Sequence, residues 1–244
     1  MTHKTRGIVI RVVKYGETSI IATIYTESFG LQSYLINNVR QSKNGGGPGN
    51  TFQPCAILDL VVYHNELKNL QRIKEYKFAV LFDTIFTSVI RNISAQYIIE
   101  LFGKSVKQTE HHPDMYYFLE DTLLHLDKAD DYIAAGLPLY FNLHLSGLLG
   151  FRIIENYSET NNILDLKEGS FKKEIPGHPY YLDKKLSALT SELLKVQQPV
   201  ELEQFNLHHE TRRALLEAYH DFYRLHIHDF GKLNTIEVLK SMQL

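Results

Sequence analysis

The sequence predicts an α+β chain with a small N-terminal β-barrel followed by a mainly α-helical domain. Two changes near residue 78 predict it. Hydrophobic residues alternate in short runs before this point and follow a helical period after it. Residues 1–77 also carry ten Lys or Arg against five Asp or Glu, whereas the remainder carries sixteen against twenty-three. We therefore predict a basic barrel over residues 1–77 and an acidic helical domain over residues 78–244.

The basic domain is predicted to contain five strands. Segments rich in Ile, Val, Leu, Thr and Tyr, separated by turn residues, cover residues 8–13, 19–25, 32–37, 56–63 and 67–76. Five short strands are too few for a sandwich but suit a small closed barrel of the OB type. An SH3-like barrel has a similar number of strands, and periodicity does not separate the two.

The acidic domain is predicted to be helical. Apolar residues recur at helical spacing from Phe78 to Leu101, and Gly103 stands where a C-terminal cap is expected. Further helices are predicted over 116–126 after the helix-opening Pro113, over 138–149, and from near residue 207 toward residue 231. Glycine and proline residues mark a loop-rich insert at about residues 155–183.

Composition excludes several classes of protein. Hydrophobic residues make up 44% of the chain and charged residues 22%, as expected for a folded protein. No apolar run reaches the roughly 18 to 20 residues of a membrane span, and the N-terminus lacks a signal sequence. The single cysteine, Cys55, excludes an intramolecular disulfide and is expected as a buried strand thiol. We expect a cytoplasmic protein that does not bind membranes.

Motifs for catalysis and nucleotide binding are missing. Gly103-Lys104-Ser105 ends like a phosphate-binding loop, but the glycine required five positions earlier is Ile98. The glycine tract at 45–49 favours a flexible loop over a nucleotide cradle, because no Lys-Ser/Thr pair follows it. No Ser-His-Asp arrangement stands in a nucleophile context, while pairing of carboxylates depends on the fold. We predict no catalytic residues and no enzyme activity.

Twelve histidines raise the question of a metal site. His226 and His228 lie two residues apart on a predicted helix and therefore face different directions. His209 begins a His-Glu pair that lacks the second His of a zinc protease motif. We predict no metal and no cofactor.

Several segments of the chain form a recognisable series in their order and spacing. They are GIVIR at 7–11, YGETS at 15–19, YTESFG at 25–30, NVRQSK at 38–43, FQP at 52–54, LQRIKE at 70–75, and the C-terminal Tyr223, His226, Phe230, Leu233, Val238 and Leu239. Together they resemble the RecO family, the bacterial DNA repair and recombination mediators. Asn38 stands where the family usually has glycine, while Arg40 and Lys43 remain. Many members of the family carry a four-cysteine zinc site in the insert between helices. The insert of this chain contains no cysteine, so zinc is expected to be absent.

The resemblance implies a protein that binds single- and double-stranded DNA and anneals complementary strands. It also implies binding to RecR and to the acidic C-terminal tail of single-strand DNA-binding protein, indirect action on RecA, and a cytoplasmic location with the nucleoid. Cations on the first turn, the glycine loop and the last strand could line one groove for phosphates. They are Arg11, Lys14, Arg40, Lys43, Arg72 and Lys74. Tyr15 and Tyr63 are candidates either for base stacking or for packing in the barrel.

Two alternatives remain at this stage. One is a helical adaptor whose barrel docks a protein partner without binding DNA. The other concerns the cations of the helical domain, which either rim an apolar pocket for the acidic tail or pair with neighbouring carboxylates. These cations are Arg91, Lys104, Lys107, Arg152, Arg212 and Arg213.

Overall fold

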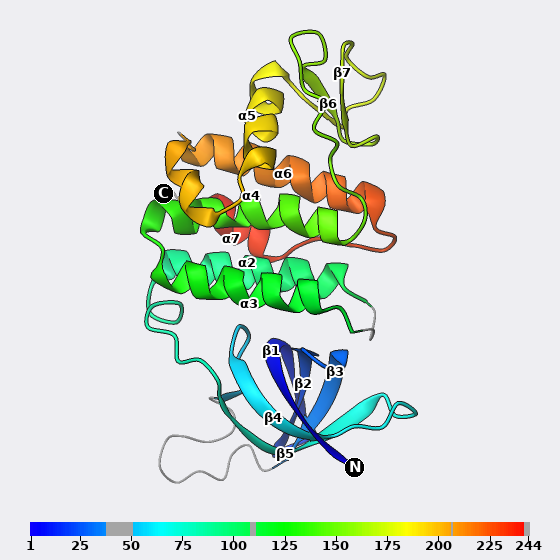
Figure 1. The fold of residues 1–244 in the computed structure, drawn as a ribbon, viewed down its shortest axis with the longest axis vertical. Helices are drawn as coiled ribbons and strands as arrows, with labels where there is room; N and C mark the ends of the chain where they lie inside the picture. Colours follow the sequence, from blue (N-terminus) through cyan, green and yellow to red (C-terminus); the bar gives the residue numbers. More distant parts are fainter. Residues whose placement is uncertain (38–50, 108–110, 206, 242–244) are drawn as a thin grey trace. The chain divides into compact units, whose positions relative to one another are not determined.

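The computed structural model describes residues 1–37, 51–107, 111–205 and 207–241, with the backbone alone for Lys240 and Ser241 (Figure 1). The chain forms two compact units. The first comprises Met1–Asp83 and Val106–Leu124, and the second comprises Thr84–Ser105 and His125–Leu244.

The first unit contains a closed five-stranded barrel (Figure 1). Its strands are β1 (Thr2–Tyr15), β2 (Ser19–Thr26), β3 (Gly30–Ile36), β4 (Ile57–Tyr63) and β5 (Leu70–Phe78). They follow the order β1-β2-β3-β5-β4, with β4 returning to β1, and β3 pairs with β5 in parallel. This OB-like order confirms the predicted fold class and decides against the SH3-like alternative.

The barrel closes because β1 is long. Its first half pairs with β4 and its second half with β2, and the register shifts between Val9 and Arg11. Gly7 lies where the two ladders overlap. A Cβ atom at this position would come within 2.6 Å of Ile24 Cγ2, so the close approach of the strands requires glycine. The barrel interior is filled mainly by aliphatic side chains, including Val9, Ile24 and Leu58.

Most of helix α3 (Pro113–Lys128) belongs to the compact unit of the barrel. The ring of Tyr116 on this helix is stacked on that of Tyr25 on β2, with centroids 6.4 Å apart and ring planes inclined by 23°. His112 caps the start of the helix, since its Nδ1 accepts from Met115 N–H at 3.4 Å. The expected helix opening at Pro113 is therefore confirmed.

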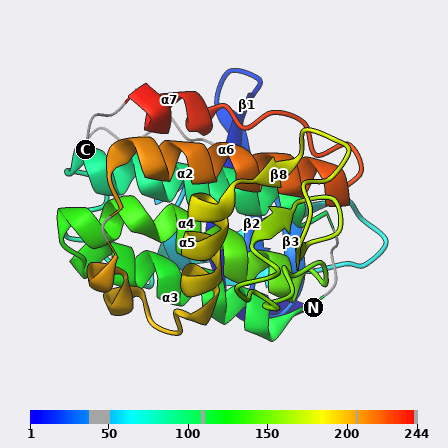
Figure 2. The ribbon, with the colours of Figure 1, turned by 90° about the horizontal axis from the view of Figure 1, so that it is seen from above.

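The second unit is built around α4 (Asp131–Leu148), which packs against α2 (Val89–Ser105) and α6 (His209–His226) (Figure 2). Asn142 of α4 joins all three helices. Its side-chain amide donates to Tyr97 Oη of α2 at 2.9 Å, and its backbone carbonyl accepts from Tyr223 Oη of α6 at 2.8 Å. The remaining helices are α5 (Lys184–Lys195), the 3₁₀ helix η1 (Pro199–Gln204) and α7 (Thr235–Ser241).

The insert contains a small antiparallel sheet that the sequence did not predict. It consists of β6 (Ile163–Asp165), β7 (Ser170–Lys172) and β8 (Tyr181–Leu182). The buried carboxylate of Asp165 accepts from the backbone N–H groups of Lys167 and Glu168, and His178 Nε2 lies 3.4 Å from it. Hydrogen bonds to a side chain therefore hold the turn between β6 and β7.

The predicted start of the first helix at Phe78 was wrong. Phe78 ends β5 opposite Leu58 of β4, so the barrel ladder takes precedence over the helical period. The N–H groups of Thr84 and Ile85 then donate to Asp127 Oδ1, and α2 begins only at Val89.

Other predicted positions also need correction. Gly103 lies inside α2 rather than at its cap, and α4 begins seven residues before Pro138, which it accommodates. Leu67 is an exposed turn residue, because β5 starts at Leu70. Cys55 is buried as expected, but it lies in a turn with φ of 76°, not in a strand.

Candidate nucleic-acid interface

The outer surface of β1, β2, β3 and β5, together with Tyr63 at the end of β4, forms a continuous face, here called the barrel face. Strand register places its side chains in rows, because residues directly opposite each other point to the same side of a sheet. One row contains Arg11, Thr23, Ser33 and Leu70, and the next contains Val13, Ile21, Leu35, Arg72 and Tyr63. The residues between these rows, such as Val12, Ala22 and Tyr34, belong to the barrel core or pack against it instead.

The two arginines stand at opposite sides of the barrel face. Arg11 on β1 and Arg72 on β5 are exposed, with the β2 and β3 side chains between them. Ile21 and Leu35 fill the middle of the second row and are only half-buried. The face therefore offers an apolar floor between two cations.

The structure brings the remaining predicted residues together only in part. Lys14 alternates to the opposite side of β1, since its partner Ile20 packs against the core. Lys74 lies at a bulge of β5, where Ile73 and Glu75 pair with successive residues of β4. A hydrogen bond from Lys74 to Glu75, 3.1 Å away, raises the pKa of Lys74 and partly neutralises its charge locally. Lys14 and Lys74 are thus weaker candidates than Arg11 and Arg72.

The two predicted stacking residues lie on the surface. Tyr63 is 47% exposed directly opposite Arg72, and Tyr15 is 54% exposed at the end of β1. Neither side chain belongs to the buried core of the described barrel. Arg40 and Lys43, the predicted cations of the glycine loop, lie outside the described residues.

A pocket of about 570 Å³ adjoins the barrel face where the turn between β4 and β5 meets β2 and β3. We call it the turn pocket. Sequence reasoning missed it, because its lining comes from separate turns and strands. Phe29 and His64 form an aromatic wall, their rings nearly parallel with centroids 4.0 Å apart.

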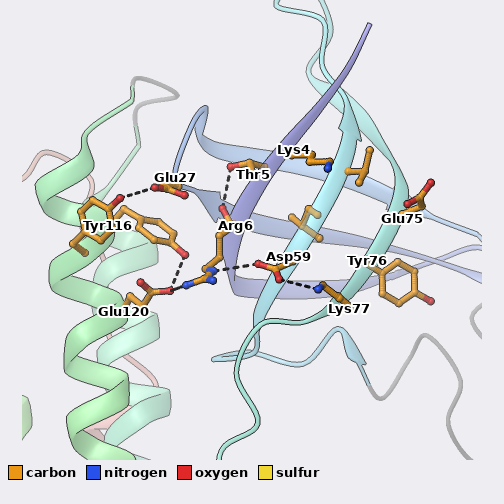
Figure 3. A pocket seen from close by; sticks show the side chains of 13 residues that line it. Lys4, Thr5, Arg6, Glu27, Asp59, Glu75, Tyr76, Lys77, Tyr116 and Glu120 are labelled. Atoms are coloured by element: carbon orange, nitrogen blue, oxygen red, sulfur yellow. Dashed lines mark hydrogen bonds and ion pairs between the residues drawn. The ribbon is translucent and has the colours of Figure 1, made fainter.

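A second pocket, of about 720 Å³, lies between β1, β4, β5 and α3 within the first unit (Figure 3). Arg6 crosses it, with Nε 3.2 Å from Asp59 and Nη1 3.4 Å from Glu120. Tyr116 Oη also donates to Glu120, at 3.2 Å. The cations of this pocket are thus largely matched by carboxylates, and it offers a free anion little attraction.

Two family models match this chain. The family described as "Recombination protein O N terminal" matches residues 1–82, and "Recombination protein O C terminal" matches residues 87–233. This chain belongs to the RecO family. The DNA repair protein RecO of Flavobacterium psychrophilum is 30% identical over 246 residues, and that of Flavobacterium johnsoniae is 29% identical over 248 residues. In both comparisons 99% of each chain is covered.

RecO from Phocaeicola vulgatus is 27% identical over 243 residues, again with 99% of each chain covered. The expected membership in the RecO family is therefore confirmed, and the chain is a DNA repair protein of that family. No helix in the described part of the chain is long and apolar enough to cross a membrane.

The insert of this RecO family member does not fit a structural zinc site. Asp165 is committed to backbone N–H groups and to His178, and the segment has no cysteine. Throughout residues 1–37, 51–107, 111–205 and 207–241, no three His, Cys, Asp or Glu side chains are grouped as metal ligands.

Carboxylate or carbonyl partners are present for Arg91, Lys104, Arg212 and Arg213. Arg91 pairs with Asp131 at 2.8 Å, Lys104 with Glu100 at 3.2 Å, and Arg213 with Glu217 at 3.5 Å. Arg212 is buried and donates to the Leu207 carbonyl. Arg152 is exposed, and it has no ion-pair partner among the described side chains.

Proposed function

We propose that the barrel, over residues 1–77, binds single-stranded DNA on the barrel face and that the chain acts as a non-enzymatic recombination mediator. The observation that carries the proposal is the placement of Arg11 and Arg72 on either side of the half-buried Ile21 and Leu35. An OB barrel binds oligonucleotides on its β2–β3 surface, between the loops that join β1 to β2 and β4 to β5. The barrel face occupies that position.

The chemistry of the face suits a single strand. Each arginine can neutralise a phosphate and release its counterions, and the apolar floor accommodates unstacked bases. Tyr63, beside Arg72, and Tyr15, at the end of β1, supply exposed rings for stacking. Contacts of this kind do not depend on base sequence, and so they suit a protein that anneals any two complementary strands.

The wider role follows from membership in the RecO family. We propose that the chain also binds double-stranded DNA, pairs with RecR, and engages the acidic tail of single-strand DNA-binding protein through its helical unit. These contacts would assist loading of RecA. Such a protein would work in the cytoplasm with the nucleoid.

The test is a fluorescence-anisotropy titration of single-stranded DNA at several salt concentrations. We compare the full chain with Arg11→Ala/Arg72→Ala and with the control Arg213→Ala/Arg224→Ala, which removes two exposed cations of α6. Loss of two phosphate contacts to a single strand should reduce the slope of log affinity against log salt by about 1.4 units. The control should keep the wild-type slope. Adding Tyr63→Ala should weaken binding further, by about 1–3 kcal/mol per lost stack.

An unchanged affinity in the folded Arg11/Arg72 variant would refute the assignment of the barrel face. If the wild-type protein binds no DNA and captures a protein partner with little dependence on salt, the adaptor alternative is correct. The half-buried Ile21 and Leu35 would then form the docking surface.

A further inference from the structure

The turn pocket is lined by hydroxyl and amide groups that phosphate binding does not require. We infer that it takes a single unstacked nucleobase from the strand bound on the barrel face, an inference that rests on the proposed function. Its volume of about 570 Å³ falls within the range of about 300–1,000 Å³ typical of small-ligand sites.

Uncharged hydrogen-bonding groups line the pocket and are available to a ligand. Thr23 Oγ1, Ser33 Oγ and the Asn69 amide line it and make no hydrogen bond within the described residues. Gln32 donates through Nε2 to the Phe29 carbonyl at 2.8 Å, which leaves its Oε1 to accept. Hydroxyl and amide groups of this kind match the donors and acceptors on the edge of a base.

The frame of the pocket is fixed before a ligand arrives. Gln71 is buried and accepts from Asn65 N–H at 3.0 Å, while its Nε2 donates to the carbonyls of Asn65 and Lys68. These bonds hold the turn that carries Asn69. The stacked rings of Phe29 and His64 supply a rigid wall, and His3 packs edge-on against Phe29 at 5.5 Å. A preformed pocket reduces the entropy lost when a base is ordered in it.

Charge argues for a base rather than a phosphate. Among the described residues that line the pocket, Lys68 is the one Lys or Arg and Glu66 is the one Asp or Glu, so their charges cancel. The arginines lie just outside, since Arg11 shares a row with Thr23 and Ser33, and Arg72 follows Gln71. The backbone of a bound strand can therefore follow the arginines while one base turns into the pocket.

The experiment measures the affinity of the full chain for homopolymers of dA, dC, dG and dT of equal length. A pocket that hydrogen-bonds one base should favour one homopolymer by about fivefold or more, since a pair of such contacts is worth about 1–3 kcal/mol. The variant Thr23→Val/Asn69→Ala should bind all four within about twofold of each other and keep the wild-type salt slope. Asn162→Ala, in the insert, is the matched control and should keep the preference.

A preference unchanged in the pocket variant, or equal wild-type affinity for all four homopolymers, overturns the inference while leaving DNA binding by the barrel face intact. In either case the Arg11→Ala/Arg72→Ala variant should still lose salt-dependent binding, which would show that the barrel face holds the DNA. If no DNA binds at all, the proposed function fails, and the inference fails with it. Circular dichroism checks that each variant folds, and Ser33→Ala replaces the double variant if it does not.

Discussion

Arg6 links three segments of the first unit through two carboxylates. Asp59 lies on β4 and Glu120 on α3, and the Glu120 side chain is only 9% exposed. A carboxylate that is buried to this extent needs its hydrogen-bond and ion-pair partners. Leaving a buried charge unpaired lowers the stability of the fold by more than the intact pair contributes to it. Arg6 therefore stabilises the contact of α3 with the barrel mainly by satisfying Glu120.

Replacing Arg6 by Met should lower the free energy of unfolding by about 1–3 kcal/mol, because Glu120 is left with Tyr116 as its remaining donor. Adding Glu120→Gln should recover part of this loss. Urea denaturation of the two single variants and the double variant measures the coupling. The control Lys77→Met loses only an exposed pair with Asp59 and should cost no more than about 1 kcal/mol. Equal losses in Arg6→Met and Lys77→Met would contradict this account.

Glu100 holds the start of α7 to α2. It accepts from Asn234 N–H at 2.9 Å, from Thr235 N–H at 2.8 Å and from Thr235 Oγ1 at 2.7 Å. Burial alone would raise the pKa of Glu100, but these hydrogen bonds and Lys104 hold it below its ordinary value. The ionised carboxylate therefore stabilises the fold above the pKa of unfolded glutamate, about 4.3, and this contribution disappears as pH falls through the lower folded value.

Glu100→Gln should accordingly cost about 1–2 kcal/mol at neutral pH, where the carboxylate cap is lost. The difference from wild type should shrink as both proteins are acidified to about pH 3. Urea denaturation across this range measures it. Glu237→Gln, which changes an exposed carboxylate of α7, should show little pH-dependent difference. A Glu100→Gln effect independent of pH would exclude the charged cap.

Single residues were harder to place from the sequence than strands. Arg11 and Lys14 looked equivalent as neighbours of the first turn, yet strand alternation separates them to opposite sides of β1. Arg72 and Lys74 looked equivalent by period two, but the bulge places Lys74 beside Glu75. A bulge depends on the partner strand, so no local pattern predicts it.

At the scale of elements, the alternating runs predicted all five strands, because each strand has one face in the barrel core. The start of β1 was missed by six residues, since this strand begins at Thr2 and not at Ile8. The helical period from Phe78 misled because the same apolar residues also continue β5 and fill the loop before α2. Ile85 is fully buried in that loop, so the apolar residues of this segment indicate burial and not a helix. The short strands of the insert escaped prediction, since two or three residues show no period.

The insert gives a prediction about metal. Because Asp165 and its backbone donors hold the turn of the small sheet, the purified protein should contain less than one zinc per chain. Its melting temperature should be the same with and without chelator. Elemental analysis and a thermal melt measure both. One tightly held zinc per chain would show ligands that neither the insert sequence nor its contacts indicate.

At the scale of the whole chain, we expect DNA and the acidic tail of single-strand DNA-binding protein to occupy separate sites. The barrel domain is basic and the helical domain acidic, and Arg152 is an exposed cation in the latter. A peptide of that tail, ending in phenylalanine, should therefore bind the full chain without displacing single-stranded DNA. Removing the terminal phenylalanine from the peptide should abolish its binding to the protein.

Anisotropy with a labelled oligonucleotide and unlabelled peptide at constant ionic strength provides the measurement. We expect DNA affinity to stay within about twofold at saturating peptide. Arg152→Ala should weaken the peptide alone, and Arg11→Ala/Arg72→Ala should weaken DNA alone. Mutual displacement would mean that both ligands use the barrel, and the division between domains would then be wrong.

The pairing of Arg6 with Glu120, 114 residues apart, also bears on synthesis of the chain. At about 5–20 residues per second, roughly 6–23 seconds separate the translation of the two residues. During that interval α2 has been made, but the helix that covers Tyr25 and Arg6 has not. The surface of the nascent barrel around Arg6 and Tyr25 is therefore exposed to solvent during this interval. Ribosome-bound chains that stop before α3 should be more susceptible to proteolysis and aggregation than chains that include α3.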